Sequence, residues 1–263
     1  MQLSLTITFA VTSLIAAAFA APARWTYGPD NAGPQHWGDL SPLYAKCKTG
    51  QQQSPIDLIT EKPNVRFVSR AIEHNYQVLH RATASWIKGF AVQVDLPQFN
   101  TSTDASWIVL DGKRYDLINL HFHSPAEHRV KNYYYDAELH MVHKASDGEV
   151  AVIGIFYEVR RSDNSWFDWI DSLDKLVDRA KPKDDDAKSE IKYTVKRLDL
   201  PALVRANNGF SNRWTYTGSL TAPPCTEGVY WNVVKAPQYL GVGQLDALID
   251  LEGYNARYIQ DRQ

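Results

Sequence analysis

One segment decides both the fold class and the site of this chain: Leu117-Ile118-Asn119-Leu120-His121-Phe122-His123. Polar and apolar side chains alternate along it. Because successive side chains of a β-strand point to opposite faces of the sheet, the two histidines share one face with Asn119, and the apolar residues between them share the other. The segment is therefore predicted to be a β-strand that presents two imidazoles side by side.

A second segment repeats this pattern: Ala137-Glu138-Leu139-His140-Met141-Val142-His143. As a strand it places Glu138, His140 and Val142 on one face. His143 then points the other way, and we expect it to be a packed, hydrogen-bonded residue of the core.

Pairing of these two strands would bring His121, His123 and His140 together around one point. Three protein ligands that leave a fourth tetrahedral position open are typical of catalytic zinc, whereas structural zinc normally has four protein ligands. Glu138 and Asn119 fit a supporting role, because an oxygen that accepts the second ring N–H fixes the tautomer of a ligand histidine. The alternative is cross-strand packing of histidines without a metal ion.

The rest of the chain adds further short strands, and its 14 Tyr, 8 Trp and 9 Phe favour a β-rich body. The expected strands are Phe90–Leu96, Trp107–Leu110, Tyr115–His123, Ala137–His143 and Val150–Val159. One amphipathic helix is predicted from Ser165 to Ala180, capped by Asp163 or Asn164. We expect irregular structure over 25–55 and a solvated loop over 181–190. No internal repeat or linker divides the chain, so one domain is expected.

The overall charge excludes two classes of partner. The chain has 28 basic and 30 acidic residues and a net charge of -2, which removes the electrostatic reason to expect nucleic acid or an anionic membrane. Nothing in the sequence indicates an oligomeric state.

The first 20 residues have the features of a secretory signal. They contain no charged side chain, and Ala18 and Ala20 occupy the -3 and -1 places of a small-x-small cleavage site. The alternative is a membrane anchor; no second apolar segment long enough to span a bilayer follows. We therefore expect a signal peptide over 1–20 and a mature domain over 21–263, secreted to an extracellular or periplasmic location.

Secretion gives a meaning to two further features. In an oxidising compartment, Cys47 and Cys225 are expected to form a disulfide rather than remain free thiols. Asn100-Thr101-Ser102 is an N-glycosylation acceptor sequence where the host glycosylates.

With these residues assembled, the chain resembles the α-class carbonic anhydrases. The histidine pattern, the E-L-H-x-V-H segment and the G-S-L-T-x-P-P segment are together highly specific, and the likeness covers nearly all the mature chain in family order. The matching stretches are Trp25-Thr26-Tyr27, Gly33–Trp37, Gln53–Asp57, Asn119–His128, Ala137–His143, Val150–Phe156, Thr217–Cys225 and Asn255-Ala256-Arg257.

The resemblance implies a fold, a cofactor and an activity. The implied fold is a large, twisted, mainly antiparallel sheet with short peripheral helices, a mostly β (α+β) class. The implied cofactor is Zn²⁺ at the bottom of a cleft, and the implied activity is reversible hydration of carbon dioxide to bicarbonate through a zinc-bound hydroxide. By the same likeness, His121, His123 and His140 are the ligands, Asn119, Glu138 and the Asn255 carbonyl support them, and Cys47 and Cys225 match a bridged pair.

The resemblance also assigns Glu127 and Thr221 to catalysis. An ionised carboxylate only accepts hydrogen bonds, so the Thr221 hydroxyl must donate a hydrogen bond to Glu127. The Thr221 oxygen can then accept a hydrogen bond from the hydroxide. The implied carbon dioxide pocket is apolar, with plain core packing as the alternative for each member: Val142, Val152, Leu220, Val229 and Trp231. His128 is expected to be a structural hydrogen-bonding residue rather than a proton carrier, and Tyr27 to order water in the cleft.

Among the positions that depart from the family pattern, Phe90 and Asn119 bear on the reaction. Phe90 stands where fast members have a proton-carrying histidine, so we expect slower turnover at low buffer, with water chains, added buffer, His80 or a nearby lysine as the proton route. Asn119 stands where many relatives have Gln; its side chain is one methylene shorter, and we expect a longer or relocated bond to His121.

Two other functions compete with a zinc lyase. The fold also serves as a non-catalytic ligand-binding or adhesion module when zinc ligands are lost, and the same hydroxide can attack activated esters as a side activity. Zinc content and relative catalytic efficiencies discriminate among the three.

Overall fold

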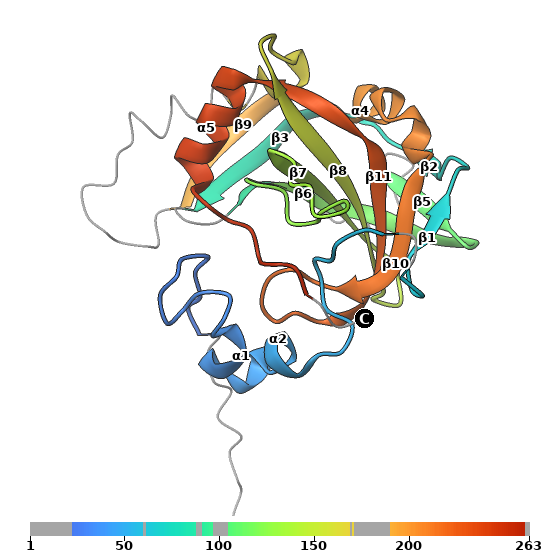
Figure 1. Ribbon diagram of the computed structural model, residues 1–263. Helices are drawn as coiled ribbons and strands as arrows, with labels where there is room; N and C mark the ends of the chain where they lie inside the picture. Colours follow the sequence, from blue (N-terminus) through green and yellow to red (C-terminus); the bar gives the residue numbers. More distant parts are fainter. Residues whose placement is uncertain are drawn as a thin grey trace, which may run out of the picture.

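The computed structural model describes residues 23–59, 62–87, 91–96, 105–168, 170 and 190–260. A large twisted sheet runs through the middle of the molecule, and short helices lie around its edges (Figure 1). The expected fold class is confirmed. The predicted signal over 1–20, Phe90 and Asn100 lie outside the described residues.

Eleven strands make up this sheet. They are β1 Arg66–Val68, β2 Glu73–Asn75, β3 Val78–Ile87, β4 Val92–Asp95, β5 Trp107–Leu110, β6 Lys113–His123, β7 Ala137–Lys144, β8 Val150–Arg160, β9 Glu190–Asp199, β10 Arg213–Ser219 and β11 Glu227–Gly241. The helices are α1 Trp37–Leu40, α2 Lys46–Thr49, α4 Leu200–Ala206 and α5 Val242–Glu252, with 3-10 turns at Pro42–Tyr44, Ser165–Phe167 and Asn208–Phe210.

The strands follow the order β1-β10-β11-β8-β7-β6-β4-β3-β9, and β5 pairs with both β6 and β2. Each of these pairings is antiparallel except that of β11 with β8, which is parallel. The expectation of a mainly antiparallel sheet is therefore confirmed. The long strands β6, β7 and β8 lie at the centre, where both faces are covered.

The five predicted strands occur as β4 to β8, with described ends that differ by at most two residues. Asn164 caps the turn at Ser165–Phe167 by accepting the Trp166 N–H at 3.1 Å. Most of the rest of the predicted helix lies outside the described residues. Of the loop predicted over 181–190, residues 181–189 lie outside them, and Glu190 is the first residue of β9. The stretch 25–55, expected to be irregular, contains the two one-turn helices α1 and α2. The elements β1 to β3, β9 to β11, α4 and α5 were not predicted either.

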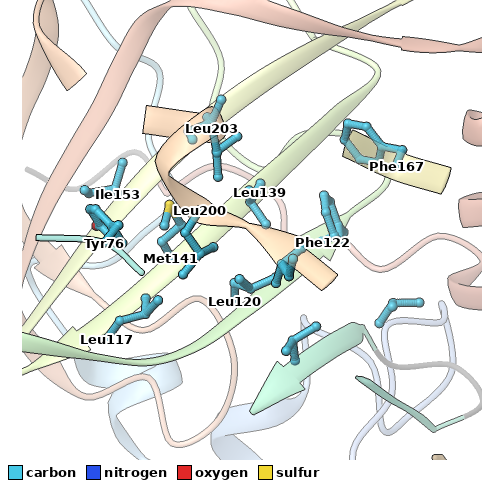
Figure 2. Packing of buried hydrophobic residues seen from close by; sticks show 14 of the residues in the cluster. Tyr76, Leu117, Leu120, Phe122, Leu139, Met141, Ile153, Phe167, Leu200 and Leu203 are labelled. Atoms are coloured by element: carbon cyan, nitrogen blue, oxygen red, sulfur yellow. The ribbon is translucent and has the colours of Figure 1, made fainter. Parts of the chain in front are cut away.

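The main core lies on the face of the sheet that the alternating apolar residues predict. Leu120 and Phe122 from β6, with Leu139 and Met141 from β7, pack beneath Leu200 and Leu203 of α4 (Figure 2). His143 belongs to this side and is fully buried, and its Nε2 lies 2.7 Å from the Tyr76 hydroxyl oxygen. The expectation of a hydrogen-bonded core histidine is confirmed.

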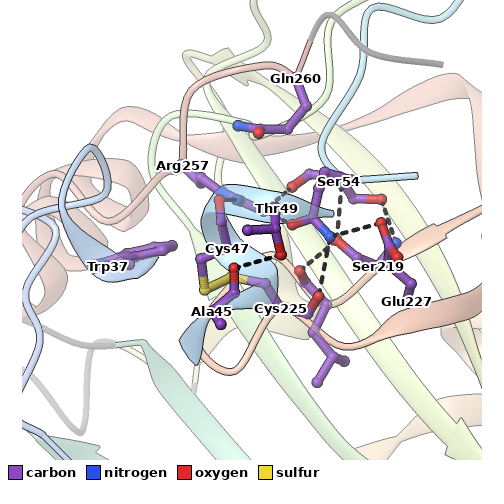
Figure 3. Close-up of a disulfide and its surroundings, with 12 residues drawn as sticks. Trp37, Ala45, Cys47, Thr49, Ser54, Ser219, Cys225, Glu227, Arg257 and Gln260 are labelled. Atoms are coloured by element: carbon purple, nitrogen blue, oxygen red, sulfur yellow. Dashed lines mark hydrogen bonds between the residues drawn. A yellow bond between two sulfur atoms is a disulfide. The ribbon is translucent and has the colours of Figure 1, made fainter. Parts of the chain in front are cut away.

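A disulfide and a buried arginine join the segment around Cys47 to the loop after β10 and to the segment around Arg257. Cys47 and Cys225 form the predicted disulfide, with their Cα atoms 5.0 Å apart (Figure 3). The guanidinium of Arg257 donates to the Cys47 carbonyl at 3.1 Å, to the Ser54 carbonyl at 2.8 Å and to Gln53 Oε1 at 3.0 Å. The C-terminal segment is thereby fixed beside α2 and the loop that follows it. None of the helices in the described ranges has the length and hydropathy needed to cross a bilayer.

Candidate metal centre

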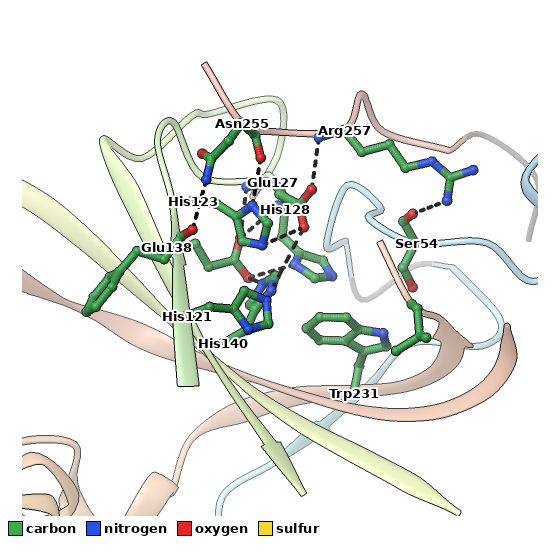
Figure 4. Close-up of polar contacts among 12 residues, drawn as sticks. Ser54, His121, His123, Glu127, His128, Glu138, His140, Trp231, Asn255 and Arg257 are labelled. Atoms are coloured by element: carbon green, nitrogen blue, oxygen red, sulfur yellow. Dashed lines mark hydrogen bonds and ion pairs between the residues drawn. The ribbon is translucent and has the colours of Figure 1, made fainter. Parts of the chain in front are cut away.

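The register of β6 against β7 assembles the histidine cluster. His121 lies directly opposite His140, and His123 lies opposite Glu138, so all four side chains project from one face (Figure 4). A bulge at Ile118 shifts the register before this stretch and leaves the pairing regular from Asn119 onward. The predicted face is confirmed.

The three rings face one another at short range. Their centroids are 5.1 Å apart for His121 and His123, 5.3 Å for His121 and His140, and 4.6 Å for His123 and His140. One nitrogen from each ring lies within 4.8 Å of the other two. Three nitrogen donors are thus positioned to bind one ion.

The second nitrogen of each ring has an oxygen acceptor. His121 Nδ1 lies 3.0 Å from Asn119 Oδ1, His123 Nδ1 lies 2.7 Å from the Asn255 carbonyl, and His140 Nε2 lies 2.9 Å from Glu138 Oε1. The 3.0 Å bond from His121 to Asn119 has an ordinary length, so the expectation of a relocated bond is wrong. The shorter side chain suffices because Asn119 and His121 are two residues apart on the same face of β6.

These acceptors fix the tautomers, since each must receive an N–H. The lone pairs are then carried by Nε2 of His121, Nε2 of His123 and Nδ1 of His140, and these atoms face one another. Within the described part of the chain, His123 Nε2 is buried without a hydrogen-bond partner. Such an arrangement is costly unless a cation binds there, and three neutral imidazoles suit Zn²⁺.

Burial keeps these imidazoles neutral. Desolvation lowers the pKa of His121 well below its usual value, and mutual repulsion with His123 and His140 lowers it further. Desolvation also lowers the pKa of His123, to about 4. It lowers the pKa of His140 below its usual value as well. A neutral ring is the form that binds a metal ion.

Glu138 is fully buried and links the cluster to the core. Its Oε1 accepts from His140 and, at 2.8 Å, from His128 Nδ1, while its Oε2 accepts the backbone N–H groups of Glu127 and His128 at 3.0 and 2.9 Å. Burial alone would raise the pKa of Glu138, but the two histidines hold it well below its usual value.

His128 has the structural role that we expected. Its Nε2 lies 2.6 Å from the Tyr216 hydroxyl oxygen, and that hydroxyl lies 2.8 Å from Ser54 Oγ. His128, Glu138 and His140 also form a group that could hold an ion. Because the two rings direct N–H groups at the same carboxylate oxygen, this group is a hydrogen-bond network.

Gly154 of β8 is a supporting residue that the sequence reading missed. It pairs with His140, and a Cβ built at this position would lie 2.8 Å from Glu138 Oε1 and 3.4 Å from Val233. Glycine therefore leaves the space that the carboxylate occupies. The available signal was a glycine inside a run of β-branched residues, which often marks a close approach.

Glu127 lies beside the cluster. Its Oε1 accepts the Arg257 backbone N–H at 2.8 Å, and its Oε2 lies 3.5 Å from His123 Nε2 and 3.9 Å from His140 Nδ1. Desolvation raises its pKa to about 7, whereas His140 and the buried Thr221 hydroxyl act in the opposite direction. The structure thus brings Thr221 and Glu127 together at the histidines.

An apolar wall completes the site on the same face of the sheet. Its members are the five residues expected to form the substrate pocket: Val142, Val152, Val229 and Trp231 are buried in one cluster, and Leu220 packs against it. The Trp231 ring lies 4.8 Å from the His140 ring, and its N–H donates to the Ser219 carbonyl at 2.9 Å. The Tyr27 ring is buried 6.3 Å from the His123 ring.

Comparisons with known proteins agree with this geometry. A family model described as eukaryotic-type carbonic anhydrase matches residues 32–261. A carbonic anhydrase from Nostoc sp. is 32% identical over 245 residues, which cover 92% of this chain and 84% of that protein.

Solved structures show the same likeness. The α-carbonic anhydrase from Thermovibrio ammonificans, in complex with the inhibitor sulfanilamide, has a TM-score of 0.73 at 32% identity, covering 92% of this chain and 97% of that one. The fungal α-carbonic anhydrase from Aspergillus oryzae has a TM-score of 0.76 at 28% identity, covering 90% and 93%. Since the family model spans most of the chain, the chain belongs to the eukaryotic-type, or α-class, carbonic anhydrase family, whose members are carbonate dehydratases.

Proposed function

We propose that His121, His123 and His140 bind Zn²⁺ and that the enzyme hydrates carbon dioxide reversibly to bicarbonate and a proton. The observation that carries this proposal is the convergence of three imidazole lone pairs whose other ring nitrogens are all committed to oxygen acceptors. Bound zinc would acidify a water at the open fourth position until it is a nucleophile at neutral pH, an effect for which carbonic anhydrase is itself the standard example.

Glu127 and Thr221 would orient the nucleophile. A cation at the three imidazoles lowers the pKa of a neighbouring carboxyl, so Glu127 is expected to be ionised in the loaded enzyme. An ionised Glu127 would accept a hydrogen bond from the Thr221 hydroxyl, and the Thr221 oxygen would then accept a hydrogen bond from the reacting oxygen and direct that oxygen's free lone pair toward the substrate.

The apolar wall would hold carbon dioxide. This substrate has no strong hydrogen-bonding group, so a dry surface beside the nucleophile is what can position it. Val142 pairs with Val152 across β7 and β8, and both flank the histidines on the same face. The inhibitor in the Thermovibrio ammonificans enzyme supports the proposal that this site accepts small molecules.

Proton export is proposed to depend on buffer or water because Phe90 cannot bind a proton. Stopped-flow turnover should therefore rise with imidazole concentration, and Phe90→His should raise the rate at low buffer. A rate that responds to neither change would point to another carrier, such as His80.

We also propose that residues 1–20 direct secretion, that residues 21–263 form the mature enzyme and that Asn100 is glycosylated where the host allows it. The Cys47–Cys225 disulfide supports an oxidising compartment. N-terminal sequencing and mass determination of the secreted protein would test all three statements.

The test of function is stopped-flow hydration of carbon dioxide by the zinc-loaded enzyme and by Thr221→Ala. Loss of a single orienting group at a reacting centre typically costs about 10²-fold in rate, and we expect a loss of that order with zinc content unchanged. Thr226→Ala is the control, because Thr226 lies in the same loop with an exposed side chain. Absence of zinc-dependent hydration in the wild type, or an unimpaired Thr221→Ala, would contradict the proposal.

A further inference from the structure

The face of the sheet that lies away from the histidines carries a groove of about 890 Å³ beside β1, β10 and β11. The pairings align Arg66 with Thr215 and Thr215 with Asn232, so these three residues share this face. Arg213, two residues before Thr215, projects to the same side, whereas Trp214 projects toward the apolar wall of the metal centre. The side chains of these four residues therefore lie across the sheet from the histidines, although Tyr216 and Trp231 also contribute to the lining of the groove.

Arg213 is the buried cation of this groove, with an exposed fraction of 4%. Its Nε donates to Asn232 Oδ1 at 2.8 Å, and its Nη1 donates to the carbonyls of Arg70 and Phe210 at 2.6 and 3.2 Å. In the described ranges, Nη2 makes no hydrogen bond, and no carboxylate forms an ion pair with this guanidinium. Nη2 is therefore available to donate to an anionic acceptor.

Two exposed arginines, Arg66 and Arg70, line the same groove. The carboxylates along the groove are those of Glu73 and Asp111, so three cations face two anions. Arg70 Nη2 lies 3.8 Å from Asp111 Oδ1, and both side chains are largely exposed, at 78% and 97%. Exposed pairs of this kind are weak, so Arg70 is free to exchange this partner for another anion.

We propose that this groove binds a small oxyanion, a phosphate or a carboxylate, between Arg213 Nη2 and the guanidinium groups of Arg66 and Arg70. A guanidinium group matches the oxygen spacing of these anions and donates charge-assisted hydrogen bonds to them. The hydroxyl of Thr215 and the amide of Asn232 provide polar neighbours on the same face. The three arginines do not belong to the histidine cluster, and the groove shares one residue, Trp231, with the apolar wall of the metal centre.

The test is an NMR titration of the zinc-loaded, isotope-labelled protein with inorganic phosphate at constant ionic strength. We expect saturable shifts of the Thr215 and Asn232 backbone amides, with a dissociation constant of about 1 mM or lower. These shifts should saturate at a different concentration from any change at His121 and His140, which separates the groove from the metal centre.

Three variants make the test specific. Arg66→Gln with Arg70→Gln should weaken binding at least about tenfold, because two charged donors are lost. Asp111→Asn should tighten binding severalfold, because it removes the competing carboxylate; Asn tolerates the positive φ of 48° at this position. Arg161→Gln with Arg197→Gln removes two exposed charges that do not line the groove, and binding should stay unchanged.

Each other outcome overturns the proposal. Shifts that are not saturable, or that occur only at the histidines, would show that phosphate does not bind in the groove. Equal weakening by the two double variants would show a general effect of net charge. Weaker or unchanged binding in Asp111→Asn would show that Asp111 does not compete with the anion.

Discussion

Three different kinds of oxygen hold the three histidine rings: the amide of Asn119, the backbone carbonyl of Asn255 and the carboxylate of Glu138. The carboxylate is the most consequential, because its four hydrogen bonds also fix His128 and the backbone at Glu127. Residues 119 and 138 could be predicted from alternation on their own strands. Asn255 could not, because a carbonyl 132 positions away leaves no local pattern; only the family resemblance indicated it.

Replacement of Glu138 by Gln should weaken zinc binding and destabilise the fold. Four N–H groups donate to the Glu138 carboxylate, and the glutamine amide offers them only one oxygen acceptor. Its NH₂ group replaces the other oxygen and faces N–H groups that it cannot accept from. We expect zinc affinity to fall about 10–100-fold, the general range for supporting residues, of which carbonic anhydrase is a standard case, and the free energy of unfolding to fall by about 1–3 kcal/mol.

Chelator competition and urea unfolding measure the two effects. Glu158→Gln is the matched control, because that residue is partly exposed and, within the described residues, its carboxylate accepts one long hydrogen bond of 3.5 Å, from Tyr133. Wild-type zinc affinity in Glu138→Gln would contradict the supporting role.

His143 should make stability depend on pH below neutrality. Desolvation lowers its pKa in the folded state to about 3, whereas an unfolded histidine titrates near pH ~6.5. Above pH ~6.5 His143 is neutral in both the folded and the unfolded state, so it does not reduce the free energy of unfolding. As the pH falls from there toward 3, only the unfolded state gains the proton, and the free energy of unfolding decreases. This group should cost about 1.4 kcal/mol per pH unit over that window.

The measurement compares urea unfolding of the wild type and His143→Gln between about pH 5 and about pH 6.5. The glutamine does not titrate, so its stability curve should be shallower by the stated slope, while the metal ligands contribute equally to both proteins. Parallel curves would show that His143 is not buried in its neutral form.

At the scale of elements, alternation identified the central strands but not the outer ones. In β6, β7 and β8, apolar residues alternate or run continuously between turn residues, which is the pattern of a strand covered on one or both faces. β9 carries charged side chains on its exposed positions, and β11 contains Pro237 and changes register between Val234 and Gln238. These features weaken the strand pattern, and no local signal reports the parallel pairing of β11 with β8.

The close packing of β7 against β8 makes Gly154 a sensitive position. Gly154→Ala would place a methyl group 2.8 Å from Glu138 Oε1, which must then move away from His140 or His128. We expect a loss of about 1–3 kcal/mol in the free energy of unfolding, typical of overpacking, together with weaker zinc binding.

Gly243→Ala supplies the contrast. It lies in α5 without a positive φ, and a Cβ there meets nothing within 4 Å; it should stabilise the protein by about 0.5–1 kcal/mol, because alanine has the better helix propensity. Urea unfolding measures the free energy of unfolding of both variants. Equal changes in Gly154→Ala and Gly243→Ala would refute a special role for Gly154.

At the scale of the whole molecule, segments near residues 47–54 and 255–257 complete a site that lies on the central strands. The guanidinium of Arg257 donates to the Ser54 carbonyl in the loop after α2, and the backbone N–H of Arg257 donates to Glu127. The backbone carbonyl of Asn255 accepts the ring N–H of His123. The disulfide anchors the same N-terminal segment to the loop after β10. The sequence predicted the cysteine pair from compartment and number, but the contacts of Arg257 required the structure.

Replacement of both cysteines by Ser should lower the free energy of unfolding by about 2–5 kcal/mol, the usual effect of losing a native disulfide. Zinc affinity should change much less, because Arg257 binds the backbone carbonyl of residue 47 and not its side chain. Urea unfolding and chelator competition on the purified double variant measure the two quantities. An unchanged stability, or a loss of zinc binding as large as that in Glu138→Gln, would contradict this separation.

X-ray absorption spectroscopy at the zinc edge of the loaded protein tests the account most directly. Three imidazole scatterers at about 2.0–2.1 Å and one light-atom ligand that a small anion displaces are the predicted result. A fourth scatterer that belongs to the protein, or fewer than three imidazoles, would contradict the claim that His121, His123 and His140 bind the metal and leave its remaining position open to the reactants.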